Sequence, residues 1–74
     1  MQLYKNLSGQ SGVAAFEIGV DFVKVVFHGN PRVYVYSARN ITPAKIEHMK
    51  QLAAAGRGLA TFISQNPDVR AGFS

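Results

Sequence analysis

The chain has 74 residues and a formal net charge of +4, so it is long enough for a single small domain. Hydrophobic residues make up 47% of the chain and charged residues 16%, a balance that argues against intrinsic disorder. The absence of cysteine excludes a disulfide framework and thiolate metal sites, and it fits a reducing compartment. No signal peptide and no apolar stretch of membrane-spanning length is found, so a cytoplasmic protein without a membrane anchor is predicted.

Three β-strands are predicted in the first half of the chain. Residues 1–12 read as a weakly structured lead-in, and residues 13–18 alternate larger apolar and smaller or charged side chains, as in a half-buried strand. Residues 22–28 and 32–37 are rich in valine and aromatic residues, and the turn residues Gly29, Asn30 and Pro31 separate them. Because the connections are short, we expect an antiparallel meander.

Two short helices are predicted in the second half. Thr42 and Pro43 are typical of a helix start, and apolar residues then recur at helical spacing. Gly56 is a natural stop for this helix. A second helix is expected over residues 58–66, ending at Pro67.

The predicted fold is therefore α+β, with a three-stranded antiparallel meander followed by two short helices on one sheet face (β-β-β-α-α). Residues 13–66 form the single domain, and residues 67–74 are expected to be a frayed tail. The other sheet face should stay open or meet a partner. The predicted core consists of apolar residues from both layers: Val23, Val25, Phe27, Ile46, Met49, Leu52, Phe62 and Ile63.

The pairing register of the second and third strands decides where the tyrosines point. If Phe27 opposes Val33, then Tyr34 and Tyr36 lie on the open face. If Phe27 opposes Tyr34, both tyrosines turn toward the core, because a slip of one residue exchanges the two faces of a strand. Amphipathicity favours the first register, since it leaves Arg32 in solvent.

The first register would give a face on which aromatic and basic side chains alternate. Nucleic-acid bases stack on such aromatic rings for ~1–3 kcal/mol each, while Lys and Arg hold phosphates. The alternative for each tyrosine is burial with a bonded hydroxyl. Arg39 lies in a predicted loop and is the best single phosphate contact. The candidate nucleic-acid-binding residues are Lys24, Arg32, Tyr34, Tyr36, Arg39 and Arg57.

The segment Tyr34-Val35-Tyr36 follows a strand in which Val23, Val25 and Phe27 alternate with other residues. After it come a predicted helix, a glycine-containing junction at residues 53–58 and a short helix with an aromatic residue. In these features, over about residues 11–66, the chain resembles the KTSC domain, a family of small domains with a Tyr-x-Tyr signature. That family occurs at the C-terminus of some lysyl-tRNA synthetases and as stand-alone proteins of bacteria and phages. The resemblance implies that Tyr34 and Tyr36 carry the signature. The family has no established function, and its association with the synthetases suggests RNA binding.

The chain departs from the KTSC pattern at two places. Val35 stands where the family usually has a polar residue, which removes a clue to the facing of the tyrosines. Ala55-Gly56 or Arg57-Gly58 replaces the usual Ser-Gly of the helix junction.

No catalytic or metal-binding pattern emerges from the sequence. His28 and His48 lie in different predicted elements, and no metal-ligand spacing or nucleophile elbow is present. We therefore predict a non-enzymatic protein without cofactor, metal or small-molecule substrate. Two classes of function remain: binding of RNA or another polyanion, and interaction with a protein partner or a second copy through the open face or an edge strand.

Overall fold

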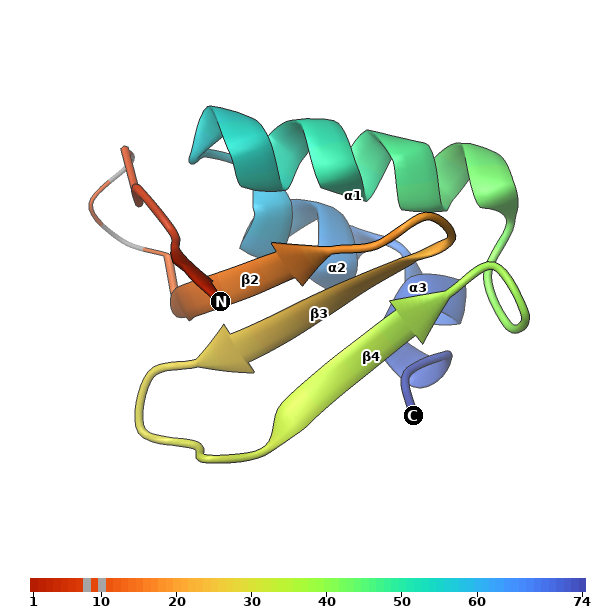
Figure 1. Cartoon of the computed structure of the whole chain (residues 1–74), viewed down its shortest axis with the longest axis horizontal. Helices are drawn as coiled ribbons and strands as arrows, with labels where there is room; N and C mark the ends of the chain where they lie inside the picture. The colour runs from red at the N-terminus through yellow and green to blue at the C-terminus, as the bar shows by residue number, and fades with distance from the viewer. Residues whose placement is uncertain (8, 10) are drawn as a thin grey trace.

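A computed structural model describes residues 1–7, 9 and 11–74, and these residues form an α+β fold with an antiparallel sheet and helices on one of its faces. The described strands are β1 (Gln2–Leu3), β2 (Val13–Ile18), β3 (Phe22–Phe27) and β4 (Val33–Ser37). The described helices are α1 (Pro43–Ala55), α2 (Leu59–Gln65) and α3 (Pro67–Ala71). Figure 1 looks onto the open face of the sheet, with α2 and α3 behind the strands.

The predicted meander is confirmed, but the sheet of the described residues has four strands, in the order β1-β2-β3-β4. The extra strand, β1, lies in the expected lead-in, where Gln2 pairs with Phe16. A two-residue strand is too short to show a period of two, so the sequence pattern missed it. Tyr4 anchors this segment, because its buried hydroxyl accepts a hydrogen bond from the Leu59 N–H at 3.3 Å. Residues 8 and 10 of the lead-in lie outside the described residues.

The expected boundaries of the first helix are confirmed. Thr42 is the N-cap and Pro43 is the first helical residue. Gly56 is the C-cap, with a left-handed φ of 78°, and its N–H donates to the carbonyls of Leu52 and Ala53. The second helix, α2, begins one residue after the predicted start.

The predicted frayed tail is instead structured. Pro67 ends α2 and at the same time opens α3, where proline fits because the first helical N–H needs no partner. Val69 on α3 is fully buried. Beyond α3, Ser74 exchanges two backbone hydrogen bonds with Val35, of 3.0 and 2.9 Å, on the outer edge of β4.

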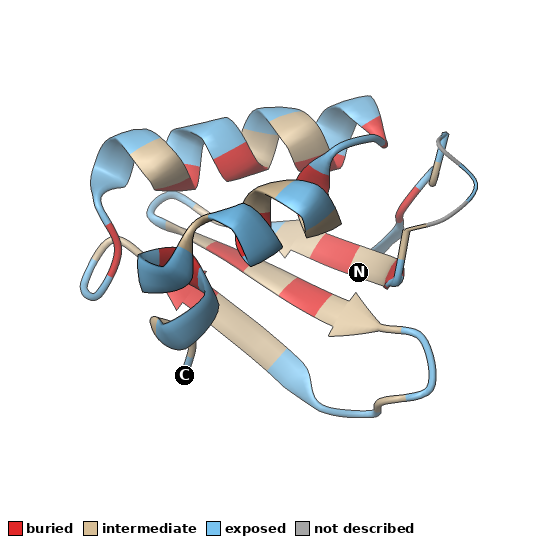
Figure 2. Cartoon of the chain, turned by 180° about the vertical axis from the view of Figure 1, so that it is seen from behind, coloured by how far each residue is buried: buried red, intermediate tan, exposed pale blue. Residues whose placement is uncertain are grey.

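The core lies between the sheet and the helices, and Figure 2 shows buried positions in both layers. Five predicted core residues are buried: Val23, Val25, Ile46, Met49 and Ile63. Three others are only partly buried and pack against this core: Phe27, Leu52 and Phe62. The buried residues that the prediction omitted come mostly from the two ends of the chain and from the strands: Tyr4, Val13, Phe16, Tyr36, Ile41, Ala53, Leu59 and Val69.

The register of β3 and β4 turns the tyrosines inward. Val25 pairs with Tyr34 and Val23 pairs with Tyr36, so both tyrosines share the face of the core valines. The register favoured from the sequence is therefore wrong. The alternative register, with Phe27 opposite Tyr34, predicted the correct inward direction of the tyrosines. In the structure Tyr34 pairs with Val25 instead, two residues away, because the loop between the strands is longer than a tight turn.

Candidate interaction face and basic hollow

The sheet face opposite the helices, called the open face here, is mainly apolar. One row across the strands joins Ala15, Val26 and Val33 as paired neighbours. Val33 is 41% exposed, and Leu3 at the β1 edge is 82% exposed. The strand residues of the open face, set by the pairing and the alternation of side chains, are Ala15, Glu17, Phe22, Lys24, Val26, Val33, Val35 and Ser37.

One ion pair lies in the middle of the open face. Glu17 and Lys24 are paired across β2 and β3, and their charged atoms are 3.8 Å apart. The Lys24 ammonium is also 5.5 Å from the centre of the Phe22 ring. Both side chains of the ion pair remain partly exposed, so the pair adds little to stability but places two opposite charges side by side within an apolar surface.

A hollow of about 650 Å³ lies at one end of the open face. It brings together two predicted site residues, Lys24 and Arg39, while Asp21 adds a carboxylate. Lys24 and Arg39 can together hold an anionic group in the hollow, whereas the carboxylate of Asp21 would repel a group with a high negative charge. The residues that line this basic hollow are Asp21, Phe22, Lys24, Val35, Ser37, Arg39, Asn40 and Ser74.

The two tyrosines lie on the opposite side of β4 from the hollow. Tyr36 is 2% exposed, and burial together with the neighbouring Tyr34 raises the pKa of its hydroxyl to about 12. Tyr34 is partly buried and packs edge-on against Phe27 and Phe73, with ring centres 5.4 and 4.7 Å away. Its hydroxyl accepts a hydrogen bond from the Asn30 side chain at 2.9 Å. The tyrosines are thus packing residues in this structure, and no base can stack on the buried ring of Tyr36.

The remaining predicted basic residues do not join Lys24 and Arg39. The Arg32 guanidinium lies 5.0 Å from the centre of the Tyr34 ring and 4.9 Å from that of Phe73. Arg57 is exposed in the corner between α1 and α2. The predicted aromatic and basic face is therefore divided among the hollow, an aromatic cluster around Tyr34, and a helix corner. Phe73 is the cluster member that sequence reasoning missed, since a lone aromatic after a short helix carries no periodic signal.

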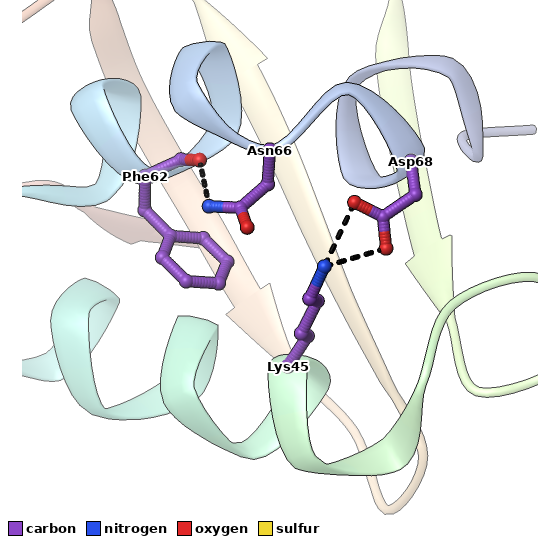
Figure 3. Close-up of polar contacts among 4 residues, drawn as sticks. All are labelled: Lys45, Phe62, Asn66 and Asp68. Carbon is purple, nitrogen blue, oxygen red and sulfur yellow. Dashed lines mark hydrogen bonds and ion pairs between the residues drawn. The ribbon is translucent and has the colours of Figure 1, made fainter.

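Ion pairs neutralise several charges on the helices. The Lys45 ammonium contacts both carboxylate oxygens of Asp68, at 2.9 and 2.7 Å, and this joins α1 to α3 (Figure 3). The hydrogen bond from Lys45 lowers the pKa of the exposed Asp68 carboxyl. Lys50 pairs with Glu47 at 2.7 Å and donates to the Val20 carbonyl at 2.6 Å. Two lysines of α1 are therefore engaged in contacts within the domain.

These features define the class of the protein as a small α+β domain with one covered and one uncovered sheet face. No family model, curated protein or solved structure matches the chain. Within the described residues, no three His, Cys, Asp or Glu side chains gather as metal ligands would. No helix of the described part of the chain has the length and apolar character needed to cross a membrane.

Proposed function

We propose that the protein is a non-catalytic interaction domain that self-associates through its open face. The observation that carries this proposal is the apolar row of Ala15, Val26 and Val33 on a sheet face that no helix covers. Contiguous apolar patches of several hundred Å² are rare on monomeric proteins, and they mark interaction sites when polar residues surround them. Here Arg39 and Asp21 provide polar groups at the rim.

The open face of a second copy of the chain matches this face both in its apolar surface and in the arrangement of its charges. The two partners of a two-fold interface present the same patch, so the patch must complement itself. The neighbouring Glu17 and Lys24 satisfy this requirement, since each carboxylate can meet the ammonium of the other copy. The domain measures 29 × 22 × 22 Å, so its outline limits the interface to at most roughly 600 Å² per copy, at the low end for specific interfaces. A weak, reversible dimer is therefore expected.

The replacement Val26→Lys tests the proposed dimer. It places an unpaired charge in the centre of the apolar row, on an inner strand that keeps its hydrogen bonds. In sedimentation equilibrium, the wild-type mass should rise with concentration, and the variant should need at least about tenfold more protein for the same rise. Thr61→Lys on the exposed surface of α2 adds the same charge and should leave association unchanged. A wild type that stays monomeric at millimolar concentration would contradict the proposal.

Polyanion binding at the basic hollow is a second candidate function, and the convergence of Lys24 and Arg39 favours it. We retain membership of the KTSC family, with its implied link to RNA, and a cytoplasmic location as parts of this proposal. With only two cations in the hollow, binding would be weak and would fall steeply with salt.

Fluorescence anisotropy with a labelled single-stranded oligouridylate at low salt tests this second function. The double variant Lys24→Ala, Arg39→Ala should bind more weakly and lower the salt slope by about 1.4, since each phosphate contact contributes ~0.7 on a single strand. The double variant Arg57→Ala, Arg70→Ala removes the same charge from exposed positions elsewhere. An equal loss in both double variants would show that net charge, and not the hollow, holds the RNA.

A further inference from the structure

The outer edge of β4 carries a second surface, which we call the aromatic socket and define by Arg32, Tyr34, Val35 and Tyr36. Phe73 occupies it, with its ring centre 4.7 Å from that of Tyr34 and 6.3 Å from that of Tyr36. The Arg32 guanidinium lies against both Tyr34 and Phe73. The socket thus holds one aromatic side chain by edge contacts and by a cation over its ring.

The backbone of the same segment is held as an added strand. The Val35 N–H donates to the Ser74 carbonyl at 3.0 Å, and the Ser74 N–H donates to the Val35 carbonyl at 2.9 Å. Phe73 lies opposite Tyr36 in antiparallel orientation. The β4 edge therefore binds an extended segment that has an aromatic residue opposite Tyr36.

The path into the socket depends on Gly72. A Cβ at this position would lie 2.8 Å from the Asp68 carbonyl oxygen and 2.8 Å from Ile41 Cγ1. The turn from α3 into the socket therefore requires glycine before the aromatic residue. This constraint applies to the chain's own tethered segment, and a peptide that approaches from solvent is free of it.

The outer edge of β4 continues from Val35 to Val33. Backbone groups of a strand point alternately to its two sides, so the N–H and carbonyl of Val33 point outward as those of Val35 do. Ser74 reaches Val35, and Val33 is 41% exposed. A peptide strand that extends past the position of Ser74 could bond to both residues.

We propose that the aromatic socket is a peptide-binding site for an extended segment that carries an aromatic side chain, and that residues 73–74 are its tethered competitor. The incoming peptide adds to β4 in antiparallel orientation, places its aromatic ring among Arg32, Tyr34 and Tyr36, and extends along the edge to Val33. The aromatic ring of the peptide would lie on the sheet face opposite to Val26, while its backbone would run along Val33 and Val35, whose side chains belong to the open face.

The full chain with Phe73→Ala provides the test, because this change empties the socket and leaves β4 intact. The probe is a synthetic peptide with the sequence Arg-Ala-Gly-Phe-Ser-Val-Thr, and its matched control has alanine in place of phenylalanine. We expect the probe to shift the amide NMR signals of Val33 and Val35 in the variant. Wild type should require at least about tenfold more probe, because its own segment competes at a high effective concentration.

Absence of binding to a folded Phe73→Ala variant at millimolar probe would overturn the proposal, as would equal binding of the control peptide. If Phe73→Ala does not fold, Phe73→Leu replaces it, since leucine keeps apolar volume in the socket but loses the aromatic contacts. The leucine variant should then bind the probe at lower concentration than wild type. Equal concentrations for the leucine variant and wild type would count against the socket.

Discussion

Replacing Tyr36 with alanine is expected to lower the free energy of unfolding by about 3–5 kcal/mol, the usual cost of deleting a buried aromatic ring. The ring is 2% exposed, pairs with Val23 across the sheet and contacts the Phe73 ring. A domain of 74 residues has a total stability of roughly 4–11 kcal/mol, so the variant should be close to unfolding at room temperature. Urea denaturation followed by circular dichroism measures the change. A loss within about 0.5 kcal/mol would place Tyr36 on the solvent side and contradict the register.

The variant Tyr36→Phe is the matched control and separates packing from titration. Phenylalanine keeps the ring, so stability at neutral pH should stay close to that of wild type. In wild type, the folded pKa of about 12 lies above the unfolded value of 10.0, so the unfolded chain loses its proton first. Stability is therefore complete below pH 10 and falls as the pH rises from 10 to about 12, by roughly 2–3 kcal/mol in total. The phenylalanine variant should not show this part of the loss of stability at alkaline pH, because it has no hydroxyl to titrate at position 36.

The facing of the tyrosines shows where sequence patterns stop being decisive. On β4, Val33 and Val35 alternate with Tyr34 and Tyr36, so both sides of the strand are apolar. Amphipathicity therefore does not distinguish the valine side of the strand from the tyrosine side. The tyrosine rings are larger than the valine side chains, and they fill the space beneath the helices. The register depends on the length of the loop after Phe27, which its turn residues do not determine.

Local signals predicted the elements much better than the contacts between distant segments. The Thr42-Pro43 start and the Gly56 stop of α1 depend on backbone preferences within a few residues, and both were correct. The convergence of Lys24 and Arg39 follows from strand pairing, and the place of Phe73 depends on the packing of α3. Such contacts between distant segments leave no periodic trace in the sequence, so only part of the candidate site was predictable.

The replacement Gly56→Ala is expected to cost about 2–4 kcal/mol, from two sources. At φ 78°, a residue with a Cβ pays ~1–2 kcal/mol for the left-handed conformation. In addition, that Cβ would lie 2.5 Å from the Cβ of Lys5, so the N-terminal segment would have to move. This movement would also disturb the hydrogen bond of 2.7 Å from the Leu7 N–H to the Gly56 carbonyl. Urea denaturation of the full chain measures the loss.

Gly58 provides a matched control two residues away, because it has nearly the same φ, 81°, but its added Cβ would lie 3.4 Å from the Leu52 side chain. Gly58→Ala should therefore cost only the conformational part, about 1–2 kcal/mol. A double-mutant cycle then isolates the contact with Lys5. If the collision causes the excess, Gly56→Ala should cost less in a Lys5→Gly background than in wild type. An unchanged cost would mean that backbone strain alone makes glycine necessary at the junction of α1 and α2.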